Sequence, residues 1–228
     1  MPMTTQADSS AEPRAPLSRD RVLHAAISLA DEGGIESLTM RKLGQALGVE
    51  AMSLYNHVTN KDDILDGILD VVVGEIDVPS KGADWKAAIR QTAISAHEVL
   101  LRHPWACNLM FSPTRVSPAR LRWTESVLAT LREAGFSPEM THHAYHALDS
   151  HITGFTLWQV SFPFSAEDLA EIGAAFLREL PVDDYPYLAE HIEQHLTDSS
   201  HDDGGEFEFG LDLILDGLER VRGGTGDT

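Results

Sequence analysis

The stretch that decides the fold is TMRKLGQALGVEAMSLYNHVTNK, residues 39–61. It divides at Gly48, whose permissive backbone suits a sharp turn between two short helices. The second half carries small, hydroxyl and amide side chains. The first half has a predicted inner face made of Met40, Leu43, Ala46 and Leu47. This pattern is typical of a helix-turn-helix, in which one helix braces against the DNA backbone and the next enters the major groove.

Capping residues predict the helices around this segment. Ser18 and Thr39 are good N-caps for the first and second helices, and Gly33-Gly34 stops the first. A third helix is expected from about Ala51 to His57, and Asn60 is placed to cap a fourth. We therefore predict a small DNA-binding domain over residues 18–78, preceded by a polar, proline-containing disordered arm at residues 1–17.

The character of the chain changes after Val78-Pro79-Ser80-Lys81-Gly82, so we place a domain boundary there. Residues 79–223 are predicted to form a larger domain for effector binding and dimerisation. Prolines separate its expected helices, which cover about 84–102, 105–111, 118–134, 138–161, 166–180, 185–197 and 206–222. No strand pattern or internal repeat is visible. The expected fold class is all-α, a helix-turn-helix head followed by a helical body.

Composition limits the class of protein. A chain of 228 residues with 43% hydrophobic content can bury a substantial core. The single cysteine, Cys107, excludes an internal disulfide framework and fits a reducing cytosol. The first residues hold no apolar secretory segment, and no apolar run approaches the roughly 20 residues that span a bilayer. We expect a cytoplasmic protein without a membrane partner.

The net charge of −19 argues at first against DNA binding. However, five basic residues balance five acidic ones between Ser18 and Lys61, so the acidic surplus lies elsewhere. Phosphate affinity depends on local cations, which release counterions from the DNA. The sequence therefore predicts modest DNA binding that weakens strongly with salt.

Residues 17–65 resemble the head of the tetracycline-repressor (TetR) family. The matching features are Gly33-Gly34-Ile35, Leu38-Thr39-Met40-Arg41, Leu43-Gly44, Leu47-Gly48-Val49 and the segment from Leu54 to Lys61. The resemblance implies a ligand-responsive transcriptional regulator that binds a palindromic double-stranded DNA operator as a homodimer. It also implies release by a small-molecule effector. Repression is expected rather than activation, because no segment suits contact with polymerase.

Eight residues are predicted to contact DNA. Thr39 offers its hydroxyl or amide to a phosphate, or serves only as an N-cap. Arg41 reads guanine or holds a phosphate, or is a plain surface arginine. The resemblance implies phosphate contacts for Tyr55 and Lys61, with a packing ring as the alternative for Tyr55. The other predicted contacts come from the third helix, Met52, Ser53, Asn56 and His57.

The last helix is predicted to form the dimer interface. Its apolar positions 207, 211, 214, 218 and 221 follow 4-3-4-3 spacing, and its glycines permit close helix approach. The resemblance implies a four-helix interface completed by the helix at 138–161. The predicted interface residues are Gly154, Phe207, Gly210, Leu211, Ile214, Gly217 and Leu218. The alternative is that this stripe packs within its own chain.

The resemblance also implies an effector cavity in the body. An apolar cavity with a few polar groups suits a small, mostly apolar ligand. The predicted lining residues are Trp105, Met110, Trp123, His146, Asp149, Phe155 and Trp158. The alternative for each is ordinary core packing.

His142, His146 and Asp149 share one helical face, which suits a transition metal, a polar cavity wall or a solvated surface. No other cofactor is expected. An enzyme is not expected either, because the helical zinc-hydrolase pattern lacks its adjacent glutamate and no nucleotide or nucleophile motif appears. The alternative function is a ligand-binding or adaptor protein without sequence-specific DNA binding. The weakly basic head favours it, as does Thr59, which stands where many relatives carry lysine.

Overall fold

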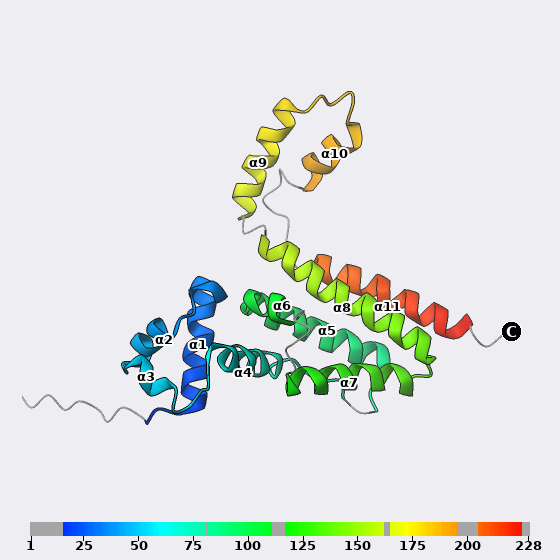
Figure 1. Cartoon of the computed structure of the whole chain (residues 1–228). Coiled ribbons are helices and arrows are strands. Elements are labelled where there is room, and N and C mark those ends of the chain that lie inside the picture. The colour runs from blue at the N-terminus through cyan, green and yellow to red at the C-terminus, as the bar shows by residue number, and fades with distance from the viewer. Residues whose placement is uncertain (1–15, 81, 111–116, 162–164, 196–204, 225–228) are drawn as a thin grey trace, which may run out of the picture. The chain divides into compact units, whose positions relative to one another are not determined.

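The computed structural model describes residues 16–80, 82–110, 117–161, 165–195 and 205–224, which form helices and no strand (Figure 1). The all-α prediction is confirmed. Most of the predicted N-terminal arm, residues 1–15, lies outside the described residues. The α-helices are α1 (Arg19–Gly33), α2 (Met40–Leu47), α3 (Ala51–Leu54), α4 (Lys61–Val73), α5 (Trp85–Arg102), α6 (Pro104–Met110), α7 (Pro118–Glu133), α8 (Pro138–Ser161), α9 (Ala166–Glu179), α10 (Pro186–His195) and α11 (Glu206–Gly224).

The chain divides into two compact units, Met1–Ile68 and Leu69–Thr228, and the division falls inside α4. A short 3₁₀ helix, η1 (Ile35–Ser37), joins α1 to α2. None of the described helices has the length and apolar character needed to cross a membrane.

The first unit is built on caps and a small apolar core. The hydroxyl of Ser18 accepts the Arg21 N–H, and the hydroxyl of Thr39 accepts the Lys42 N–H, as predicted for N-caps. The fully or almost fully buried core side chains include Val22, Ala26, Leu43, Leu54 and Ile64. Burial of these side chains provides most of the stability of so small a unit.

Two details of the head differ from the sequence prediction. Ala46 is exposed, because Gly44 and not Ala46 is the buried neighbour of Leu43 on α2. Helix α3 ends at Leu54 and does not reach His57. Beyond it the chain tightens, since the Tyr55 N–H donates to a carbonyl only three residues back.

The turn between α2 and α3 depends on two glycines. Gly48 ends α2 with φ 69° and ψ 34°, the left-handed conformation that glycine adopts without strain. Gly44 has no room for a side chain, because a Cβ there would lie 2.9 Å from the Val49 carbonyl oxygen. The close approach of these backbones fixes the start of α3 against α2.

In the second unit, α8 packs against α5, α6, α7 and α11 (Figure 1). Aromatic side chains fill this core. Trp85, Trp105 and Trp123 are buried, and the ring of Trp85 meets that of Phe136 edge-on at 5.0 Å. Helices α9 and α10 contact each other and form a hairpin.

Ion pairs join α5 to one face of α11. Lys86 Nζ lies 2.6 Å from Asp216 and 2.7 Å from Glu219, and the Arg90 guanidinium pairs with Asp212 and Glu208. Hydrogen bonds to these carboxylates raise the pKa of Lys86 to about 12. The acidic face of α11 is therefore turned towards α5.

Candidate functional site

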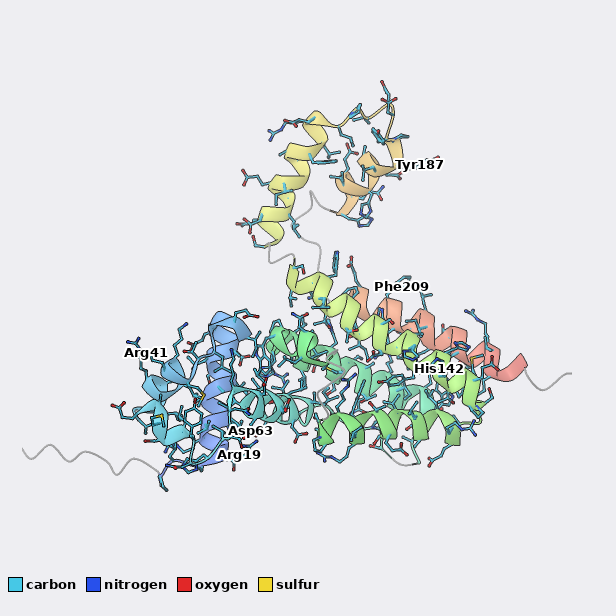
Figure 2. The ribbon with its side chains drawn as sticks, in the orientation of Figure 1. Arg19, Arg41, Asp63, His142, Tyr187 and Phe209 are labelled. Atoms are coloured by element: carbon cyan, nitrogen blue, oxygen red, sulfur yellow. The ribbon has the colours of Figure 1, made fainter. Side chains whose placement is uncertain are left out.

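The exposed surface of the first unit lies over α2 and α3. Met52 is 75% exposed and Tyr55 is 46% exposed, whereas Leu54 between them is fully buried. Leu54 therefore anchors the segment while its neighbours face solvent. Figure 2 shows the Arg41 side chain at the outer edge of α2, where it is exposed. This arrangement presents a guanidinium, a thioether and a phenol from one small unit.

The other predicted contact residues lie in the same unit. Asn56 and Lys61 are exposed, whereas Ser53 and His57 are partly covered. The Thr39 hydroxyl accepts the Lys42 N–H at 3.2 Å, so it acts as an N-cap while its own O–H remains able to donate. The eight predicted residues thus come from the start of α2, from α3 with its following turn, and from the start of α4.

Sequence reasoning missed the ion pair that supports this surface. The Arg19 guanidinium donates two hydrogen bonds to the Asp63 carboxylate, which also accepts the Thr59 N–H at 2.8 Å. The Asp63 N–H donates in turn to the Asn60 side chain at 2.8 Å, closing a capping box at the start of α4. The hydrogen bond from Arg19, followed by that from Thr59, lowers the pKa of Asp63 to about 2. The Asn60-x-x-Asp63 spacing was the signal for the cap; nothing in the spacing identified Arg19.

In the second unit, two predicted effector residues meet at one small cavity. Trp123 and Asp149 line it, at the junction of α5, α7 and α8. Its volume is about 10 Å³, and its complete lining is Ile89, Thr92, Ala93, Trp123, Val127, Tyr145, Leu148, Asp149 and Ile152. Sequence reasoning missed Thr92 and the Tyr145 phenol as polar members of this wall.

The polar groups of the cavity wall have unequal surroundings. Trp123 Nε1 donates to the Thr92 hydroxyl at 3.0 Å, and the Tyr145 hydroxyl lies 3.4 Å from that of Thr124. Burial raises the pKa of the Asp149 carboxyl, opposed by the charges of Arg120 and His146. The cavity is thus apolar, with one carboxyl group at its edge.

The remaining predicted effector residues do not join this cavity. Trp105 and Met110 are buried elsewhere in the core, whereas His146 and Trp158 are exposed. Phe155 packs against Phe207 at 5.6 Å between ring centroids. The prediction placed these residues together because they share aromatic or polar character, but they lie on different faces of their helices.

A larger groove of about 600 Å³ opens between the loop before α5 and helix α7. Carboxylates from Asp84, Glu125 and Glu133 are among its lining groups, and it is open to solvent. A mostly apolar ligand is better served by the enclosed cavity, because burial in an apolar environment supplies its binding free energy.

The histidines of α8 do not gather into a metal centre. The His142 and His146 rings lie 4.5 Å apart on the exposed side of the helix (Figure 2), whereas Asp149 lines the cavity. Within the described ranges, no group of three potential ligands is placed to hold a metal ion. The solvated-face alternative fits the two histidines.

A different histidine is buried. His97 Nδ1 lies 2.8 Å from the Thr156 hydroxyl, and its ring stacks on Phe207 at 3.9 Å. Burial, reinforced by the neighbouring His151, lowers the pKa of His97 to about 4. This imidazole is therefore a neutral member of the core between α5, α8 and α11.

Comparison with known proteins agrees with this two-part structure. Residues 22–68 match the family described as bacterial regulatory proteins, tetR family, and residues 78–222 match the tetracyclin repressor-like C-terminal domain. The chain belongs to the TetR family. A relative from Saccharopolyspora erythraea, an HTH-type transcriptional regulator, is 32% identical over 91% of this chain and 86% of its own length.

Two further TetR-like proteins are informative. The HTH-type transcriptional repressor DrrR1 of Streptomyces coeruleorubidus is 31% identical over 91% of this chain and 79% of its own length. The crystal structure of Streptomyces coelicolor ActR in complex with actinorhodin superposes with a TM-score of 0.74 at 29% identity, covering 92% of this chain and all of that one. This TetR-family chain is a ligand-responsive, DNA-binding transcriptional repressor and not an enzyme.

TetR-family regulators work as dimers, and the structure corrects which residues of α11 are free to take part. Phe207, Leu211 and Leu218 are buried in their own chain, where α11 packs on α8 and α5. The intrachain alternative therefore holds for these three. Gly210 also serves the chain's own packing, because a Cβ there would lie 2.6 Å from the His151 ring. Ile214 is partly covered.

Another apolar face of α11 remains open. Phe209 and Leu213 are 68% and 56% exposed, and Figure 2 shows Phe209 on the outer side of the helix. Gly217 follows at the same four-residue spacing, and a Cβ there would meet nothing within 4 Å. The same holds for Gly154 on α8. Sequence reasoning overlooked this stripe because the 207/211/218 stripe is the longer apolar one.

Proposed function

We propose that the protein represses transcription by binding a palindromic operator as a homodimer in the cytoplasm, and that a small, mostly apolar effector releases it. The observation that carries this proposal is the surface formed by Arg41, Met52 and Tyr55 over the buried Leu54. A large thioether left 75% exposed on a short helix suits contact with a thymine methyl in the major groove. We assign residues 18–78 to DNA binding and residues 79–223 to effector binding and dimerisation.

The proposal gives each exposed group of the head a role. Arg41 pairs with guanine or with phosphate, and the Tyr55 hydroxyl and Lys61 ammonium hold phosphates. The Thr39 hydroxyl donates to a phosphate while it caps α2. The remaining contacts to base edges come from α3 and the turn after it, Met52, Ser53, Asn56 and His57.

We propose that the dimer interface is the open face shared by α8 and α11. The other two faces of α11 are occupied, one by the core and one by the ion pairs to Lys86 and Arg90. Glycines with open space in the single chain, at 154 and 217, allow a second copy to approach closely. Exposed apolar side chains complete this interface, Trp158, Phe209 and Leu213. A dimer doubles the contacts of one head by spanning half-sites about 34–36 Å apart or a multiple of that.

We propose that the effector enters between α5, α7 and α8, where Trp123 and Tyr145 offer apolar rings. A cavity of about 10 Å³ holds no more than about one water molecule, so a ligand must displace the wall. Binding then favours a conformation in which the helices are spread, and operator affinity falls if DNA favours the other conformation.

Selection of bound duplexes from a random library at about 50 mM salt tests the function. A palindrome should be enriched, and its affinity should fall steeply at about 200 mM salt because counterion release drives phosphate contacts. Arg41→Ala and Tyr55→Phe should weaken binding, whereas Gln45→Ala, on the exposed side of α2, should not. If folded dimeric protein enriches no sequence, the alternative of a ligand-binding or adaptor protein replaces the repressor proposal.

A further inference from the structure

We infer that the effector is an organic cation, an amine on an aromatic or other apolar frame, whose nitrogen is held by the carboxylate of Asp149. The inference rests on the proposed function, since it names the chemical class of ligand for the cavity between α5, α7 and α8. Four observations carry it: the lack of a hydrogen-bond donor to Asp149, the position of the neighbouring cations, the aromatic wall and the charge of the chain.

The Asp149 carboxylate lines an apolar cavity without a hydrogen-bond donor from any described residue. The nearby polar groups are already engaged, since Trp123 Nε1 donates to Thr92 and the Tyr145 hydroxyl meets that of Thr124. A carboxylate removed from water without a partner destabilises a fold. Its position is explained by a ligand that supplies the missing donor.

The protein's own cations do not fill this role. Arg120 acts on Asp149 only through its charge, because its guanidinium donates to the Met110 carbonyl. His146 also acts at a distance, and its side chain is exposed on α8. These charges favour the ionised carboxylate without forming a hydrogen bond to it, so Asp149 keeps its acceptor capacity for a ligand.

The walls and the overall charge both favour a positive ligand. Trp123 and Tyr145 stand in the same lining, and aromatic faces attract ammonium groups. The chain carries a net charge of −19, a field that draws small cations towards the protein and repels anions. An apolar frame is required as well, because the rest of the lining consists mainly of aliphatic side chains such as Ile89 and Leu148.

A pair of compounds of nearly equal shape tests the inference. 2-Naphthylmethylamine carries an ammonium group near neutral pH, and 2-naphthylmethanol is its neutral counterpart. Titration calorimetry at pH 7.5 should show the wild-type protein binding the amine at least about tenfold more tightly, as expected for a charge-assisted hydrogen bond. Asp149→Asn should abolish this preference, and Glu139→Gln, which removes one exposed charge from the same helix, should retain it.

Circular dichroism and thermal unfolding check that the variant is folded. Asp149→Asn should unfold no earlier than the wild type, because it removes a charge whose burial is unfavourable. Asp149→Leu provides a second test, since it should bind the alcohol better than the amine. The inference is overturned if the wild type binds neither compound, binds both equally, or if Asp149→Asn keeps the preference.

The same variants separate this inference from the proposed function. Asp149→Asn should select the same palindrome as the wild type, because Asp149 belongs to the second unit. Loss of amine preference in the wild type with intact operator binding overturns the cation assignment alone. Absence of operator selection overturns the repressor proposal, whatever the calorimetry shows.

Discussion

The guanidinium of Arg19 meets the carboxylate of Asp63 at 3.0 and 2.6 Å, joining the first turn of α1 to the first turn of α4 (Figure 2). The two residues are 44 positions apart in the chain. Because Asp63 also accepts the Thr59 N–H, the pair fixes the backbone that leads from the recognition segment into α4. Lys61, a predicted phosphate contact, lies on that backbone.

Asp63→Asn should lower the free energy of unfolding by about 1 kcal/mol at pH 7, since the pair is partly exposed but two-pronged. The pKa of Asp63 is lowered to about 2, so its stabilising effect is complete above the unfolded pKa near 4 and is lost as the pH falls through 2. Urea unfolding at pH 7 and at pH 2 measures this. The variant and the wild type should differ at the first pH and converge at the second; an equal difference at both would contradict the assignment.

Gly44→Ala should weaken operator binding at least about tenfold. Its Cβ would lie 2.9 Å from the Val49 carbonyl oxygen and 3.2 Å from the Ala51 nitrogen, and both atoms belong to the backbone that starts α3. Relief of this contact must shift α3, and a displaced recognition helix loses its base contacts. Fluorescence anisotropy with the selected operator measures the loss. Gln45→Ala, exposed on the same helix, is the control, and unchanged affinity for Gly44→Ala would show that the turn tolerates the shift.

Asp70→Ala should lower the free energy of unfolding by about 1–2 kcal/mol. The Asp70 carboxylate accepts the Ser117 O–H at 2.8 Å and the Ala119 N–H at 2.7 Å, which caps the start of α7 from another helix. Without it, the Ala119 N–H loses its printed partner at a buried position. Thermal unfolding compares the variant with Glu125→Ala on the exposed side of α7; equal midpoints for the two would contradict the capping role.

His97→Gln should reduce the acid sensitivity of the fold. The folded-state pKa of His97 is about 4, below the unfolded value near 6.5, so the unfolded state binds the proton first as the pH falls. Stability is thus intact above pH 6.5 and lost between 6.5 and 4, by about 3 kcal/mol at most. Urea unfolding from pH 7 to 4 should show wild type losing more stability than His97→Gln. The exposed His143→Gln should follow the wild type.

Local patterns predicted the helices and caps of this chain, because capping and helical periodicity depend on residues a few positions apart. Ser18, Thr39 and Gly48 all act as predicted. Long-range geometry was beyond the sequence. The Arg19–Asp63 pair has no local signal, and the choice between two apolar stripes of α11 depended on which one α5 and α8 cover.

The candidate sites follow the same division. The predicted DNA contacts are close in sequence and lie together in the first unit, so a local motif was enough to group them. A cavity is lined by three separate helices, and only Trp123 and Asp149 among its predicted residues line it. Side-chain type could not reveal that Trp158 faces solvent while Trp123 faces inward, because both lie on amphipathic helices of the same unit.

Phe209→Asp combined with Leu213→Asp should convert the dimer into a monomer. These side chains are 68% and 56% exposed on the proposed interface, and burying a charge there without a partner strongly opposes association. Gly154→Leu should act in the same direction, because a side chain at this position clashes with a second copy but with nothing in its own chain. Light scattering coupled to size-exclusion chromatography measures the mass of each variant.

The matched control is Tyr187→Asp, a large and strongly exposed side chain on α10, outside the proposed α8–α11 face (Figure 2). It should leave the mass of the dimer unchanged. The monomeric variants should remain folded by circular dichroism, since their substituted positions contribute nothing to the buried core. They should also lose most of their operator affinity, because a single head contacts only one half-site. A dimeric Phe209→Asp/Leu213→Asp protein would move the interface away from α11.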